Sequence, residues 1–379
     1  MVSGKRFKGG ERSMSKAEIT SWDKNILQVS VPMDSPLRQV NSYILSDEDG
    51  RVTIIDPGPH SPDTENCWLG ILQELNLSWR DIRDIVVTHH HPDHYGLAGW
   101  LQSQSGCKVW MTERAHAEAL LMWGNGSGED AGNDTEENTG KDKGKDKGND
   151  KGNDNGKDIN DFLPVYFSRH GMTDEWSNGI KAHLESFNSQ VEPQPVVSYF
   201  NVAEPFKMGG REWQLIITGG HAPGHVSLYH AGSGLMICGD AVLPQISPNV
   251  SLLPGSDPQP LQTFLQGLRE LGSYPVSMAF PGHREPFAGF AHRVNSLLAH
   301  HEERLDTAAA LLTSGPLSGF AVCEILFRSR VTTVHQMRFA MSETLAHLAE
   351  LVRRERVVML VENGGFLFAT AESVGEHIS

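Results

Sequence analysis

Four side chains that commonly bind metal ions lie within one short stretch of this sequence. The stretch carries His89, His91, Asp93 and His94, in the order His-x-His-x-Asp-His. A buried imidazole or carboxylate is costly unless it is paired or bound to a metal, so packing alone does not explain the cluster. The preceding residues 84–87 are rich in β-branched apolar types and predict a buried strand. The cluster is therefore expected where a strand runs out into a loop, and it predicts a metal site.

Other segments share a second pattern, in which an apolar strand is followed by small residues and a potential ligand. The six residues of the first cluster cannot fill the coordination spheres of two metal ions, so these segments are candidates for the remaining ligands. They are 52–56, 215–221, 235–240 and 278–283, which end in Asp56, His221, Asp240 and His283.

In this order the segments resemble the metallo-β-lactamase superfamily, over roughly residues 20–290. The resemblance implies that His89, His91 and His221 hold one metal ion and that Asp93, His94 and His283 hold a second. It also implies that Asp240 bridges the two metals and that Asp56 holds the histidine loop by hydrogen bonds, as carboxylates outside the ligand set do. Asp93 and Asp240 are the carboxylates that we assign to catalysis. Many members have two glycines after the cluster, whereas here Gly96 is followed by Leu97, which is expected to tighten the loop.

The chemistry implied by this resemblance is hydrolysis. Two divalent ions about 3.5–4 Å apart lower the pKa of a shared water from 15.7 towards about 7, which gives a metal-bridging hydroxide. We expect zinc, with iron or manganese as alternatives, because histidine and carboxylate ligands suit all three. The expected substrate is a small-molecule carboxylic ester, thioester or lactone. Alternatives are an endoribonuclease of the same fold, a ligand-binding or regulatory protein with little turnover, and iron-dependent oxidation.

Five residues near the predicted ligands are interpreted differently. His90 lies off the ligand pattern and is interpreted as a bystander, and His225 as a hydrogen-bonded structural residue. Tyr95 is equally compatible with substrate contact and with packing. Cys238 is interpreted as a buried, inert thiol, and Arg284 as part of a surface ion pair.

Length and composition favour a cytoplasmic, reducing location and two or three domains. The chain has 379 residues, a net charge of −15 and a hydrophobic fraction of 39%. The four scattered cysteines show no disulfide framework, and no apolar run is long enough for a membrane span. Residues 1–19 are predicted to be a flexible tail without a secretory signal, and translation could start at Met1 or Met14.

Residues 124–160 differ in kind from the rest. They are rich in Gly, Asn, Asp and Lys and almost devoid of apolar residues, so they predict a disordered insertion. The insertion interrupts a region that, by the resemblance, forms a helical cover over the metals, with residues 162–200 as its second half.

The remaining elements predict an α/β fold, a four-layer αββα sandwich with two sheets between helices. Leu27, Val29 and Val31 indicate an early strand, and apolar residues from Trp68 to Leu75 recur at helical spacing. Residues 52–118 and 205–283 look like two halves that each deliver ligands to one edge.

Residues 291–379 predict a smaller module of helices followed by a hairpin, which resembles a winged helix. Two helices are expected at 291–313 and 317–328, a third along Met337–Val352, and a hairpin at Asn363-Gly364. The module has eight basic and ten acidic residues, so nucleic acid is not an expected partner. We expect it to serve in packing or in formation of a homodimer.

Overall fold

The computed structural model describes residues 18–34, 36–124, 159–327 and 330–372. The predicted tail at 1–19 and the predicted insertion at 124–160 therefore lie almost entirely outside the described residues. At their inner ends both predictions were too long, because strand β1 begins at Ile19 and helix α5 begins at Ile159.

The first sheet has seven strands in sequence order, with its first four strands antiparallel and the last four parallel. Its strands are β1 (Ile19–Asp23), β2 (Ile26–Pro32), β3 (Gln39–Ser46), β4 (Val52–Ile55), β5 (Ile82–Val86), β6 (Lys108–Met111) and β7 (Val197–Tyr199). The parallel half contains β4 and β5, which lead to Asp56 and the histidine cluster, so both loops leave the same edge of the sheet.

The second sheet has five strands in the order β12-β11-β10-β9-β8. Its strands are β8 (Phe206–Met208), β9 (Arg211–Thr218), β10 (His225–His230), β11 (Leu235–Gly239) and β12 (Met278–Pro281). A separate apolar cluster joins the two sheets, with Tyr43 and Phe280 packed edge to face at 5.5 Å between ring centroids. The sheets therefore stack face to face, with their own core between them.

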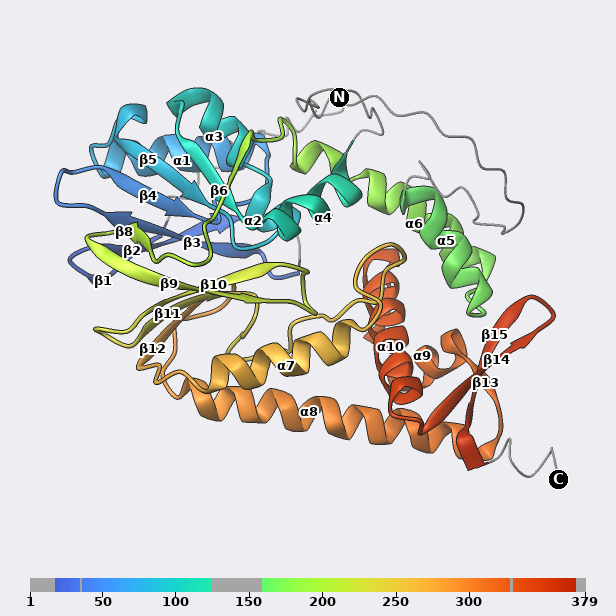
Figure 1. Cartoon of the computed structure of the whole chain (residues 1–379). Helices are drawn as coiled ribbons and strands as arrows, with labels where there is room; N and C mark the ends of the chain where they lie inside the picture. Colours follow the sequence, from blue (N-terminus) through green and yellow to red (C-terminus); the bar gives the residue numbers. More distant parts are fainter. Residues whose placement is uncertain (1–17, 35, 125–158, 328–329, 373–379) are drawn as a thin grey trace, which may run out of the picture.

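Helices cover the outer faces of both sheets, as Figure 1 shows, and this confirms the predicted αββα sandwich. The helices of this part are α1 (Pro62–Glu74), α2 (Pro92–Tyr95), α3 (Ala98–Ser105), α4 (Glu113–Trp123), α5 (Ile159–Arg169), α6 (Asp174–Glu185) and α7 (Pro260–Gly272), with short 3₁₀ turns at Trp79–Asp81 and Asn188–Gln190. In α1, Trp68, Ile71 and Leu72 are buried, as their spacing predicted, and the Trp68 indole donates to the Pro57 carbonyl at 2.7 Å. That bond ties α1 to the loop that carries Asp56.

In the described residues of the C-terminal part, helices α8, α9 and α10 accompany a three-stranded sheet of order β13-β15-β14. Its elements are α8 (Phe290–Leu311), a 3₁₀ turn (Leu312–Ser314), β13 (Leu317–Ser318), α9 (Gly319–Phe327), α10 (Val334–Arg353), β14 (Val357–Glu362) and β15 (Gly365–Thr370). The hairpin turns at Asn363 and Gly364, whose φ angles of 50° and 82° fit the left-handed positions of a type I′ turn. The three helices and the hairpin were predicted, whereas the short strand β13 was not.

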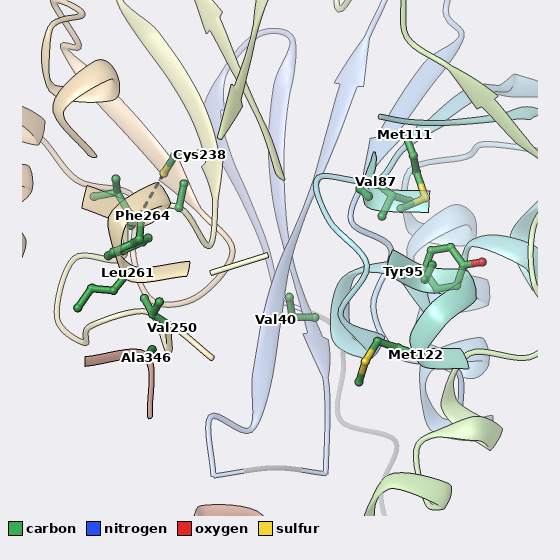
Figure 2. Packing of buried hydrophobic residues seen from close by; sticks show 14 of the residues in the cluster. Val40, Val87, Tyr95, Met111, Met122, Cys238, Val250, Leu261, Phe264 and Ala346 are labelled. Carbon is green, nitrogen blue, oxygen red and sulfur yellow. Dashed lines mark hydrogen bonds between the residues drawn. The ribbon is translucent and has the colours of Figure 1, made fainter. Parts of the chain in front are cut away.

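Helix α10 joins the C-terminal part to the sandwich. It contacts α6, α7 and α8, and Met337, Met341, Leu345 and Leu348 are buried. Ala346 belongs to the same apolar cluster as Val250 and Leu261, which Figure 2 shows near it. The two parts therefore share one core. No helix in the described residues is long and apolar enough to cross a membrane.

The hairpin also packs on the cover helices. The rings of Phe366 and Phe368 lie 4.8 and 5.8 Å from His170, in the turn after α5, and the Arg169 guanidinium lies over Phe366. In Figure 1 the hairpin lies next to α5. This face of the hairpin is used for packing within the chain.

Candidate metal centre

Four loops bring the predicted ligands to one edge of the two sheets. The histidine cluster spans the end of β5 and the start of α2, where His91 is the N-cap and Pro92 opens the helix. His221 lies between β9 and β10, Asp240 follows β11, and His283 follows β12. Each ligand thus comes directly after, or close to, the end of a buried strand, as the sequence pattern predicted.

The ligand atoms form three overlapping groups, each with its atoms within 4.8 Å of one another. The first group is His89, His91 and His221, the second is Asp93, His94 and His283, and the third is His89, His94 and Asp240. The first two are the sets that the resemblance implied for two separate metal ions.

Asp240 lies between these two sets. Its Oδ2 atom is 3.7 Å from His221 Nε2 and 3.4 Å from His283 Nε2, and its Oδ1 atom is 3.6 Å from His94 Nε2. One carboxylate oxygen therefore reaches toward a member of each set, which is the position that a bridging ligand requires.

Four of the five ligand histidines have their second ring nitrogen held by a polar neighbour. The Nδ1 atoms of His221 and His283 lie 2.8 and 3.0 Å from the carbonyl oxygens of Asn249 and Gln39. His89 Nδ1 lies 3.0 Å from Thr88 Oγ1, and His94 Nδ1 lies 2.9 Å from Asp56 Oδ2. Such partners fix the ring so that Nε2 faces the centre, which is how metal-binding histidines are usually oriented.

Asp56 lies outside the ligand groups and binds the histidine loop, as expected. It accepts hydrogen bonds from the Thr88 backbone N–H and the Thr88 hydroxyl, both at 2.7 Å, as well as pairing with His94. Its φ of 51° is left-handed, a conformation that aspartate tolerates better than most residues. The Asp56 backbone N–H donates to the Val86 carbonyl at 3.0 Å, which ties this turn to the end of β5.

The electrostatics of the centre suit a cation. Burial and the neighbouring histidines His94 and His91 lower the pKa of His89 well below its usual range. Burial opposes the charge on His94 too, but the carboxylates of Asp240, Asp93 and Asp56 raise its pKa well above normal. Burial likewise raises the pKa of Asp240, yet His283 and His94 bring it well below normal. The carboxylates of the centre thus stabilise positive charge at this site.

The residues fit a pair of divalent metal ions by an independent criterion. His94 Nε2, His221 Nε2 and Asp240 Oδ1 are buried and have no hydrogen-bond partner among the described residues. Unpaired buried polar atoms are rare in folded proteins. Imidazole nitrogen and carboxylate oxygen are the donors that zinc and related metals take, so a metal would satisfy these atoms.

The five neighbouring residues are arranged as follows. His225 is buried, and its Nε2 accepts from the Asp240 backbone N–H at 3.2 Å, so it positions Asp240. Tyr95 is fully buried in the apolar cluster between the first sheet and the helices that cover it (Figure 2). This burial favours the packing interpretation. Cys238 is buried, and burial raises the pKa of its thiol. His90 is buried on the pocket wall, and Arg284 is exposed with no recorded ion pair among the described residues.

The departure at Gly96-Leu97 has a packing explanation. Leu97 is fully buried, and its N–H donates to the Gly58 carbonyl at 2.8 Å. A Cβ at Gly96 would lie 2.0 Å from the Gln190 carbonyl oxygen, so this position needs glycine. The buried Leu97 side chain therefore adds core packing that a second glycine would not, and Gly96 lets the Gln190 carbonyl approach the loop.

A pocket of about 860 Å³ opens onto the ligands. No substrate-binding residue was assigned from the sequence. In the structure, the wall of this pocket is formed by residues from segments that lie far apart in the chain. Apolar residues of the wall include Met33, Met122, Phe187, Leu253 and Phe339, and polar ones include His183, His335 and Arg338. His335, Arg338 and Phe339 come from α10, where only their place beside the buried methionine stripe hinted at burial.

Comparison with protein families gives two matches that follow each other along the chain. Residues 35–283 match the family described as the metallo-beta-lactamase superfamily. Residues 305–372 match a family described as the metallo-beta-lactamase-like C-terminal domain.

Individual relatives match over nearly the whole chain. A probable metallo-hydrolase, YqjP of Bacillus subtilis (strain 168), is 23% identical over 355 residues, which cover 92% of this chain and 98% of that protein. A beta-lactamase domain protein from Burkholderia ambifaria is 28% identical, with a TM-score of 0.76 and coverage of 93% and 94%. The metallo-beta-lactamase family protein TTHA1429 from Thermus thermophilus is 26% identical, with a TM-score of 0.74 and coverage of 92% and 100%. The similarity thus includes the C-terminal part.

Proposed function

Because the chain belongs to the metallo-beta-lactamase superfamily, we propose that it is a hydrolase with two divalent metal ions, zinc in the first instance, that cleaves a carboxylic ester, thioester or lactone. The observation that carries the proposal is the convergence of two three-residue ligand sets with Asp240 between them. The relative from Bacillus subtilis is described as a probable metallo-hydrolase, which supports metal-dependent hydrolysis. The choice of acyl substrate and of zinc is our inference.

Each residue has a defined task in this proposal. His89, His91 and His221 would hold one metal ion, Asp93, His94 and His283 the other, and Asp240 both. The ions would lower the pKa of a water molecule and polarise the carbonyl group that it attacks. Asp56 and the other hydrogen-bond partners of the histidine rings hold these rings in fixed orientations, so that little reorganisation is needed during the reaction.

The pocket supports a small acyl substrate. Its volume lies in the range typical of small-molecule sites, and its wall carries several apolar side chains. The acidic residues Asp34 and Asp257 also line it and would repel a polyanion more strongly than a substrate with a single negative charge. An RNA substrate is therefore the weaker candidate, and it is included in the test below.

We also propose that the C-terminal part is a winged-helix module with a packing role. Its elements follow in the order helix, strand, helix, helix and hairpin. Its hairpin and α10 both pack against the rest of the chain.

The test combines metal analysis with a substrate panel. Purified protein is measured for metal content and for hydrolysis of esters, thioesters, lactones and RNA. We expect H89A and D240A each to lose hydrolysis and metal, because each removes a ligand. H230A is the matched control, since His230 lies on β10 outside the ligand groups, where its side chain pairs with Ser233 and packs against the Trp213 ring. Equal rates for the metal-depleted and metal-loaded protein would refute the proposal, and cleavage of RNA alone would replace it with the nuclease alternative.

A further inference from the structure

A buried arginine that has no acidic partner among the described residues lines the pocket. Arg338 on α10 is 8% exposed, and its side chain has no recorded ion pair or hydrogen bond among the described residues. Its guanidinium carbon lies 4.2 Å from the ring centroid of Phe339 and 5.7 Å from that of Phe187. The aromatic rings hold the guanidinium in place but do not neutralise it.

This arrangement is costly for the protein by itself. Burial lowers the pKa of Arg338 to about 10, so the group remains charged at neutral pH. A buried charge without a counter-charge destabilises a fold, and buried arginines are normally paired with carboxylates. An anion that enters the pocket would supply the missing partner.

Two histidines next to Arg338 add neutral hydrogen-bonding groups. His183 Nε2 lies 3.0 Å from His335 Nδ1, and both residues line the pocket. His183 Nδ1 is buried without a partner among the described residues. Burial and the neighbouring Arg338 charge lower the pKa of His183 to about 4, so its ring stays neutral. The helix start also contributes, because Thr333, the N-cap of α10, lines the same wall and the N-terminus of a helix favours negative charge.

We propose that Arg338, His183 and His335 form a subsite for an anionic group of the substrate, a carboxylate or a phosphate, apart from the bond that is cleaved. The inference rests on the proposed hydrolase function and narrows it to acyl substrates that carry a negative charge. The subsite and the metal centre share one pocket, and Asp93 acts electrostatically on His335. The substrate would therefore span from the ligands to the first turns of α10, with its anionic end held by Arg338.

The kinetic test uses two esters of matched length, mono-p-nitrophenyl glutarate and p-nitrophenyl pentanoate. We expect the wild type to prefer the glutarate ester. R338M should raise its KM roughly tenfold to a hundredfold, the range for loss of a charged hydrogen bond, with kcat nearly kept. Values for the pentanoate ester and the metal content should not change. R356M is the control, since Arg356 is a half-exposed arginine of the same module paired with Asp306. An equal effect of R338M on both esters would overturn the proposal.

A binding measurement separates this inference from the proposed activity. Titration calorimetry with glutarate and with inorganic phosphate, on metal-loaded protein, reports the subsite even if neither ester is turned over. We expect weaker binding by R338M and intermediate binding by R338K, which keeps the charge but loses the planar fork. The relative strength of the two anions tells which one the site prefers. Unchanged binding in R338M, or no binding of either anion by the wild type, would overturn the inference.

Discussion

At the scale of single residues, the centre depends on a position that carries no side chain. Gly282 precedes the ligand His283, and its N–H donates to the Gly239 carbonyl at 2.9 Å. A Cβ there would lie 2.3 Å from Asp240 Oδ1 and 2.5 Å from His94 Cε1. Glycine at 282 therefore allows the β12 loop to approach a ligand from each of two other loops.

We predict that G282A loses metal and activity, because the added methyl group would displace Asp240 and His94. Metal content by elemental analysis and the hydrolysis rate are the measurements. G70A is the matched control, since a Cβ at Gly70 meets nothing within 4 Å and the position lies within α1. It should keep both metals and gain about 0.5–1 kcal/mol of stability from improved helix propensity. If G282A bound metal as the wild type does, the close approach of residue 282 to Asp240 and His94 would not be required for metal binding.

At the scale of elements, the segment between β11 and α7 links a metal ligand to the C-terminal part. The Asn249 carbonyl accepts from His221, and the Asn249 side chain donates to Glu343 on α10 at 2.9 Å. Glu343 in turn accepts from Arg304 on α8 at 2.8 Å. The position of His221 therefore depends on two helices that lie outside the sandwich.

We predict that E343A weakens metal binding by about tenfold to a hundredfold, the usual range for loss of an outer partner. Removal of Glu343 takes away the charged acceptor of the Asn249 side chain, which keeps its longer bond to the Phe339 carbonyl and its bond from Ser251. It also removes the carboxylate that pairs with Arg304, so we expect the Asn249 carbonyl that orients His221 to shift. Competition with a chelator measures the affinity. E303A serves as the control, because Glu303 is a residue of α8 whose side chain is not part of this link. Equal affinities of the two variants would show that the link does not support the metal site.

Features set by local sequence pattern could be predicted from the sequence, whereas features set by contacts between distant segments could not. Strand ends could be located because apolar runs stop at ligand residues, and α10 because its methionines recur at helical spacing. The roles of Asn249 and Arg338 could not be predicted, since they arise from contacts between segments that the fold brings together. In the sequence, Arg338 cannot be distinguished from an arginine on the surface. Its burial and its lack of a partner among the described residues are visible only in the structure.

At the scale of the whole molecule, buried histidines make stability depend on pH. His301 and His347 lie in the shared core of α8 and α10, with His301 Nδ1 3.1 Å from His347 Nε2. Burial and the neighbouring His347 lower the pKa of His301 to about 2, and burial lowers that of His347 to about 4. The unfolded chain takes up these protons near pH 6.5, but the folded chain does not.

We predict that the free energy of unfolding falls as the pH drops below 6.5 and continues to fall towards pH 4. Each histidine contributes up to about 1.4 kcal/mol per pH unit in that window, and neither contributes above it. Urea unfolding at several pH values measures the slope. The H301Q/H347Q variant should show a shallower slope than the wild type, and identical slopes would contradict the assignment.

The placement of Arg338 and Glu343 late in the chain affects when the enzyme becomes competent. All seven proposed ligand residues are translated by position 283, whereas α10 follows at 334–353. A nascent or prematurely terminated polypeptide thus already carries the whole ligand set but lacks both the brace on His221 and one wall of the pocket. We therefore expect synthesis of α10 to complete both the support of the metal site and the pocket wall that selects the substrate.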